Sequence, residues 1–246
     1  MISSAADWPV PPAHPALRAG EPHVWRAALD LDAPRLAEFQ ATLSADECER
    51  AARFHFERDR SHFIAARGFL RELLSGYLDC PAAALHFSYG PRGKPALAAP
   101  AANLSFNLSH AHGLALFAFA RGAALGVDIE HVRAGFATAD IAERFFSPRE
   151  QSSLRALPAA QRAEGFFNGW TRKEAYIKAT GDGLAIPLDS FDVTLAPGEA
   201  PRLLAVRAAD ALASRWSLYD LSPGPDFAAA LVVAGGCSAP LLFAIG

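Results

Sequence analysis

The stretch Gly126-Val127-Asp128-Ile129-Glu130 lies in an apolar segment, Ala124 to His131, whose length predicts a buried β-strand. Side chains alternate along a strand, so Asp128 and Glu130 are expected on the same side. Two ionised carboxylates in a buried strand each cost several kcal/mol unless a cation compensates them. The segment is therefore either a strand end with solvated acids or part of a cation site.

A second stretch, Trp170-Thr171-Arg172-Lys173-Glu174-Ala175-Tyr176-Ile177-Lys178, predicts a helix with substantial buried surface. Glu174 and Lys178 are four residues apart and share one face of that helix. An ordinary surface ion pair between them is one interpretation. The other is that Glu174 joins Asp128 and Glu130 around a divalent cation, with Lys178 beside a phosphate-bearing substrate.

In the first half of the chain, the residue pattern predicts one strand, then helices, then three further strands. Ser44 followed by Glu47 forms a capping box, which starts a helix. The other elements expected in this half are a strand at 23–31, a helix at 60–78, and strands at 85–89, 105–110 and 114–120.

The second half repeats that plan with a strand at 124–131 followed by helices. Ser147-Pro148-Arg149-Glu150 combines an N-cap, a proline at N1 and a glutamate at N3. The other expected elements are helices at 138–145 and 159–180, the latter ending at Gly181, and strands at 191–195, 202–207, 216–221 and 227–233.

The element order predicts an α+β protein of two similar halves related by a pseudo-two-fold axis, each an antiparallel sheet packed with helices. The expected divisions are a proline-rich, loosely draped lead-in at 1–22, an N-terminal half at 23–122, and a C-terminal half at 123–246.

Composition describes an ordinary soluble chain: 246 residues, 51% hydrophobic, 20% charged, with a formal charge of −3. Without a basic stripe, nucleic acid is not an expected partner. Residues 1–15 lack a signal peptide's pattern, and the longest late apolar run, 227–234, is too short to span a membrane. The cysteines, Cys48, Cys80 and Cys237, show no paired spacing. We therefore expect a cytoplasmic protein without a membrane partner.

Two further segments carry polar groups at predicted turns or strand ends. Arg92-Gly93-Lys94-Pro95 is a tight turn that is either a solvated basic loop or a place where the backbone approaches a ligand. Ser109 and His110 end a strand, where adjacent side chains diverge, so they do not form a nucleophile–base pair. Serine hydrolase chemistry is disfavoured.

Several of these motifs, taken together and in order, resemble the 4′-phosphopantetheinyl transferases, and among them the surfactin-synthetase-activating (Sfp) type. The resemblance covers about residues 25 to 235. It rests on Gly93-Lys94-Pro95, Phe106-Asn107-Leu108-Ser109-His110, Gly126 to Glu130, Phe145-Phe146-Ser147, Phe166 through Trp170 to Leu184, and Pro187-Leu188-Asp189-Ser190-Phe191.

The resemblance implies the architecture already inferred, with the active site and its coenzyme A in the cleft between the halves. It makes Asp128, Glu130 and Glu174 ligands of Mg²⁺, although some relatives lack an acid at the position of Glu130. Mn²⁺ favours the same oxygen ligands. Lys178 is assigned to the departing phosphate, and the catalytic base is either Glu174 or Glu150.

The resemblance also implies contacts to coenzyme A. These would come from Arg50, Arg67, Arg92, Lys94, Ser109, His110, Asp128 and Lys178. Arg50 and Arg67 could equally be charges on a helix surface. This chain departs from some relatives at Glu47, where they carry a basic residue, and at Phe63, where they carry a small hydroxyl. Either the grip on the 3′-phosphate is weaker or another arginine takes it over.

The implied reaction moves 4′-phosphopantetheine from coenzyme A onto a serine of an apo acyl or peptidyl carrier protein and releases adenosine 3′,5′-bisphosphate. The carrier is expected to dock on residues 136–157, and a monomer is expected because one chain holds both halves of the cleft. Two rivals are a metal-dependent phosphohydrolase or nuclease and a non-catalytic binding module for coenzyme A or carrier protein.

Overall fold

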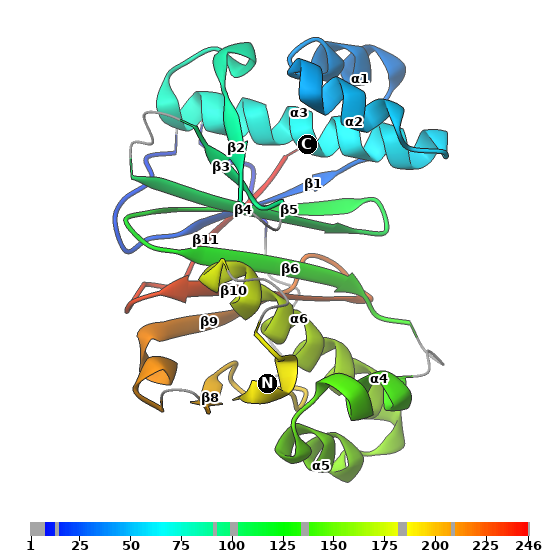
Figure 1. Cartoon of the computed structure of the whole chain (residues 1–246), viewed down its shortest axis with the longest axis vertical. Coiled ribbons are helices and arrows are strands. Elements are labelled where there is room, and N and C mark those ends of the chain that lie inside the picture. The colour runs from blue at the N-terminus through cyan, green and yellow to red at the C-terminus, as the bar shows by residue number, and fades with distance from the viewer. Residues whose placement is uncertain are drawn as a thin grey trace.

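The computed structural model describes residues 8–12, 15–90, 93–98, 103–133, 138–181, 186–207 and 210–245. It is an α+β molecule built in four layers, helix, sheet, sheet and helix (Figure 1). Helices α1 (Ala33–Gln40), α2 (Ala45–Ala52) and α3 (Glu57–Leu78) cover one sheet, and α6 (Arg162–Thr180) covers the other. No helix in the described ranges is long and apolar enough to cross a membrane.

The first sheet has the strand order β11-β1-β5-β4, and the long helix α3 packs on it over an aromatic-rich core. The capping box predicted at Ser44 is present and starts α2. Two elements, α1 and β3, were not predicted. The elements of this half are β1 His23–Ala28, α1 Ala33–Gln40, α2 Ala45–Ala52, α3 Glu57–Leu78, β2 Phe87–Tyr89, β3 Pro95–Leu97, β4 Leu104–Ala111 and β5 Leu114–Arg121.

The second sheet has the order β6-β10-β9, and a small β7-β8 pair lies beside it. The predicted helix start at Ser147 and the left-handed cap at Gly181, with φ of 81°, are both confirmed. The elements are β6 Leu125–His131, α4 Thr138–Phe145, α5 Pro148–Ala156, α6 Arg162–Thr180, β7 Phe191–Val193, β8 Leu203–Val206, β9 Trp216–Leu221, β10 Phe227–Ala234 and β11 Leu241–Ala244.

The last strand corrects the predicted division at residue 123. β11 pairs in parallel with β1, with His23 opposite Leu241, so the chain returns at its end to the sheet of the first half. That sheet is therefore not purely antiparallel. The strand was missed because Leu241–Ala244 is only four residues long and its pairing partner lies more than 200 residues earlier.

The lead-in is also not loosely draped where it is described. Trp8 is buried in the core between the sheets, and its indole N–H donates to the carbonyl of Ser222 at 2.9 Å. Leu17 is buried as well. Burial of these two apolar side chains outweighs the tendency of the surrounding prolines to form irregular chain.

Alternation along β6 decides which side chains face the site. Val127 and Ile129 point into the core that the two sheets share. Gly126 lies against α6, so Asp128 and Glu130, which have the same parity, are on the helix side. β6 and β4 are edge strands of their sheets and lie next to each other (Figure 1). The seam between the two halves therefore runs along these two strands.

Candidate active site at the seam between the halves

Asp128 is the centre of the cluster at this seam. Its carboxylate is buried, and Oδ1 accepts hydrogen bonds from Lys178 Nζ at 2.5 Å and from the Ser109 hydroxyl at 2.9 Å. Lys178 also donates to Ser109 at 3.1 Å. The other oxygen, Oδ2, is buried without a hydrogen-bond partner. A buried carboxylate oxygen without a donor is costly, so this atom calls for a cation or a polar ligand.

Helix α6 presents Glu174 and Lys178 on its half-buried face, as their spacing predicts. The ion pair that Lys178 makes is with Asp128 on β6. The alternative of an ordinary ion pair along the helix surface therefore does not account for Lys178. Instead, the lysine joins the two elements that the sequence singled out.

The three acids are close enough to influence one another. Burial raises the pKa of Glu174, and the Asp128 carboxylate raises it further, against the opposing effect of Lys178. Burial, followed by the charge of Asp128, raises the pKa of Glu130 as well. Mutual repulsion among partly desolvated carboxylates is the condition that a divalent cation relieves.

The donor chemistry of this cluster fits Mg²⁺, since it consists of carboxylate oxygens with one orphaned atom. Among the described residues, however, no three His, Cys, Asp or Glu side chains are already gathered closely enough to hold a metal ion. The three carboxylates thus share one electrostatic environment without forming a finished coordination shell.

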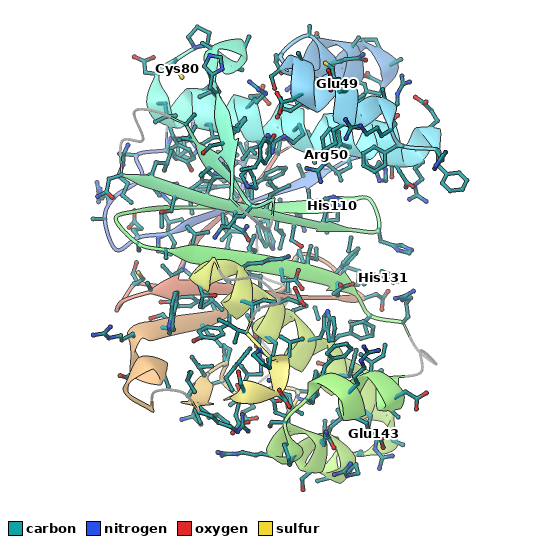
Figure 2. The ribbon with its side chains drawn as sticks, in the orientation of Figure 1. Glu49, Arg50, Cys80, His110, His131 and Glu143 are labelled. Carbon is teal, nitrogen blue, oxygen red and sulfur yellow. The ribbon has the colours of Figure 1, made fainter. Side chains whose placement is uncertain are left out.

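His110 lies at the rim of the same seam, near the end of β4 (Figure 2). Desolvation lowers its pKa, and the positive charges of His62 and Lys178 lower it further. It lines a cavity of about 340 Å³ together with Phe54, Phe63 and His62. Across the seam, the rings of His112 and His131 stack with their centroids 4.1 Å apart, which ties the two halves together here.

Lys94 reaches the seam, but the contacts it makes are to backbone rather than toward an open site for coenzyme A. Its Nζ donates to the backbone carbonyl of Lys178 at 2.5 Å and to that of Leu125 at 3.3 Å. The β2–β3 hairpin that carries it lines a second cavity, of about 350 Å³, with β4 and the start of β6. Arg92, the other basic residue predicted in this turn, lies outside the described residues.

The arginines predicted to hold phosphate are divided between surface and core. Arg50 is exposed, with its guanidinium 5.5 Å from the centre of the Phe63 ring (Figure 2). Arg67 is buried and pairs with Glu47, which also takes Arg71 at 2.8 Å. Glu47, which stands where some relatives carry a basic residue, thus forms ion pairs with two buried arginines. Arg67 is therefore directed at Glu47 and not at the Asp128 cluster.

Glu150 lies in a buried contact with Lys173 and with backbone N–H groups. It is 1% exposed, pairs with Lys173 at 2.8 Å, and accepts hydrogen bonds from the backbone N–H groups of Ser147 and Val193. Burial raises the pKa of Glu150, against the lowering effect of Lys173. Its carboxylate is therefore used to cap α5 and to join that helix to α6 and β7.

Sequence reasoning assigned no role to Asn107 or His62. The Asn107 side-chain oxygen accepts from the backbone N–H of Val127 at 2.8 Å, which fixes β4 against β6. His62 is held at 2.8 Å by Asp30 and faces the His110 cavity. The signal for Asn107 was an amide within an apolar strand, but nothing in the sequence connects Asp30 to His62.

Models of protein families match both halves of the chain. The model described as the 4′-phosphopantetheinyl transferase superfamily matches residues 124–232, and the one described as the N-terminal part of 4′-phosphopantetheinyl transferase matches residues 33–121. The 4′-phosphopantetheinyl transferase HetI of Nostoc is 42% identical over 230 residues, which cover 93% of this chain and 94% of HetI. The chain belongs to the 4′-phosphopantetheinyl transferases.

The resemblance to the Sfp type is confirmed as well. The transferase Sfp of Bacillus subtilis is 32% identical over 157 residues, covering 64% of this chain and 68% of Sfp. Among solved structures, the holo-[acyl-carrier-protein] synthase of Thermotoga maritima is a partial likeness, which covers 46% of this chain and 62% of its own, with a TM-score of 0.36 and 26% identity. The protein is an enzyme of phosphopantetheinyl transfer, and the two family matches meet at the turn between β5 and β6.

Proposed function

We propose that this phosphopantetheinyl transferase uses coenzyme A and Mg²⁺ to modify a serine of an apo acyl or peptidyl carrier protein, with adenosine 3′,5′-bisphosphate as the second product. The observation that carries the proposal is the buried Asp128, whose Oδ1 is held by Lys178 and Ser109 while Oδ2 has no partner. Glu130 and Glu174, with raised pKa values, supply the remaining acids.

Asp128, Glu130 and Glu174 would hold the metal, which when bound would neutralise charge on the pyrophosphate of coenzyme A. Mn²⁺ would be accepted by the same oxygen ligands. Lys178 is placed to attract the phosphate that departs, because its ammonium already lies at the acidic cluster and is still partly exposed, at 29% of its side chain. Ser109 and His110 would bind phosphate oxygens from the opposite half.

Glu174 is the better candidate for the base that removes the proton of the incoming serine. It shares the half-buried face of α6 with Lys178 and lies close enough to Asp128 and Glu130 for their charges to act on it. Glu150 is a positioning group in this proposal, because Lys173 and two backbone N–H groups already occupy its oxygens. Glu174 would act directly or through a water.

The two cavities beside the seam support a place for the nucleotide of coenzyme A. The cavity under the β2–β3 hairpin has apolar lining residues, Pro95, Leu97 and Phe106, against which an adenine ring would pack. The cavity at His110 is also lined by the basic side chains of His62 and Arg58. The exposed Arg50 lies over the ring of Phe63, which lines the same cavity. We assign the 3′-phosphate to the cavity at His110.

The carrier protein would dock on α4 and α5, beside the acidic cluster. Arg144 and Arg149 are exposed there, and the Phe145 ring packs on Trp170 at 5.7 Å. Phe136, the first residue of the predicted dock, lies outside the described residues. Alanine at Phe145 and Arg149 should raise the KM for the carrier several-fold; an unchanged KM would remove this surface from the proposal.

The test is the intact mass of an apo carrier protein after incubation with this enzyme, coenzyme A and Mg²⁺. We expect a gain of one phosphopantetheine, which disappears with EDTA and falls at least about 100-fold in rate for Glu174→Gln. Glu164→Gln is the matched control, because Glu164 is an exposed acid on the same helix. Coenzyme A binding without any mass gain across several carriers would favour a non-catalytic binding module.

A further inference from the structure

Lys94 joins the two halves of the molecule at the catalytic helix. It belongs to the β2–β3 hairpin of the N-terminal half, and both of its hydrogen-bond acceptors belong to the C-terminal half. One acceptor is the carbonyl of Lys178 on α6, at 2.5 Å, and the other is the carbonyl of Leu125 on β6, at 3.3 Å. Its ammonium is therefore fixed on backbone, between the helix and the strand that carry the acidic cluster.

The position of Lys178 within α6 explains why a cation is favourable there. The helix ends at Thr180, so the carbonyl of Lys178 is one of the last four, which have no partner within the helix. A positive charge at this end also meets the negative end of the helix dipole. Burial lowers the pKa of Lys94, and the charge of Lys178 lowers it further, so the two carbonyls offset part of a desolvation cost.

Lys178 is consequently held at both ends. Its carbonyl is bound by Lys94, and its ammonium is bound by Asp128 and Ser109. Any shift of the last turn of α6 moves the ammonium relative to Asp128. Lys94 thus fixes the backbone of Lys178, while Asp128 on β6 fixes the position of its ammonium.

We infer that Lys94 is a positioning residue for phosphopantetheinyl transfer: it fixes the last turn of α6 so that Lys178 meets the reacting phosphate. The sequence-based expectation was instead that Lys94 contacts coenzyme A. The inference rests on the role proposed above for Lys178. It predicts that loss of Lys94 lowers kcat, whereas loss of a substrate contact would raise the KM for coenzyme A.

The first test compares the kcat and KM for coenzyme A of Lys94→Arg, Lys94→Gln and Lys94→Met at saturating Mg²⁺ and carrier protein. Arginine keeps the charge and can still donate to both carbonyls, glutamine keeps N–H donors on a shorter and neutral side chain, and methionine has no donor. We expect kcat to fall in that order, by about 10- to 100-fold for methionine, with KM within about twofold throughout. If instead KM for coenzyme A rose in that order while kcat stayed constant, the inference would be overturned. The arginine and glutamine variants suffice for this comparison if the methionine variant does not fold.

The second test is a double-mutant cycle with Lys178→Met, because a merely structural role of Lys94 would not depend on the side chain of Lys178. We expect Lys94→Met to cost little further kcat once Lys178 is methionine. If the kcat losses of the two single variants multiplied in the double variant, the positioning role would be overturned and the proposed function would stay intact. A Lys178→Met enzyme with undiminished kcat would overturn both.

Discussion

Gly126→Ala is the substitution that most directly tests how the site is assembled. A Cβ at this position would lie 2.2 Å from the carbonyl oxygen of Ala175 and 2.5 Å from the backbone nitrogen of Ala179. Both atoms belong to the backbone of α6, so no flexible side chain can move aside. The helix would have to retreat from β6 by about 1 Å to restore an ordinary contact.

The magnitude follows from what that retreat moves. Overpacking of a well-packed contact costs about 1–3 kcal/mol of unfolding free energy. The same turns of α6 carry Glu174 and Lys178, and a misplacement of about 1 Å in a catalytic constellation costs roughly 100-fold in rate. We therefore expect a folded but less stable protein whose kcat falls far more than its stability loss would explain.

The assay is urea unfolding together with the kcat for carrier-protein modification, and Gly76→Ala is the control. Gly76 is exposed on α3 and has no atom within 4 Å of the added Cβ. Alanine there should raise stability by about 0.5–1 kcal/mol and leave kcat unchanged. If Gly126→Ala matched the wild type in both unfolding free energy and kcat, the close approach of α6 to β6 would not be what assembles the site.

Three further predictions concern charge. Glu47→Gln leaves Arg67 and Arg71 buried without their counter-charge and should cost about 3–5 kcal/mol in urea unfolding, and a loss below about 1 kcal/mol would show that the triad is not needed. Burial lowers the pKa of His23 below its ordinary value, so the unfolded chain binds the extra proton and stability should fall as the pH drops below about 6.5. His23→Gln should show a smaller loss between pH 7 and 5.5, and identical losses would count against this account. Finally, EDTA should abolish transfer and Glu130→Ala should raise the Mg²⁺ concentration for half-maximal rate by about tenfold or more, whereas an unchanged Mg²⁺ dependence would remove Glu130 from the metal site.

Local signals in the sequence predicted most elements because each signal acts within a few residues. The capping boxes at Ser44 and Ser147 work between neighbours in the chain, and both are present. Strand alternation predicted that Asp128 and Glu130 share a side, and i,i+4 spacing predicted that Glu174 and Lys178 share a face. The capping box did not indicate, however, that Glu47 also binds Arg67 and Arg71, which follow 20 and 24 residues later.

The roles of individual charges could not be predicted in the same way, because a charged side chain is committed by whichever partner the fold brings to it. Glu150 and Lys173 are separated along the chain but face each other across a dry contact, which removes Glu150 from the Asp128 cluster. Lys94 looked like a free cation in a turn and is fixed on two backbone carbonyls instead.

The sequence by itself determined the family and the α+β class, since periodicity, capping and motif order act locally in the chain, and it singled out the three acids that we propose hold the metal. Only the tertiary structure decided that Lys178 pairs with Asp128, that Oδ2 of Asp128 has no partner, and that the last strand returns to the first sheet. The physical reason is distance along the chain. These contacts join segments tens to hundreds of residues apart, and packing of the two sheets and α6, to which Gly126 contributes, is what brings them together.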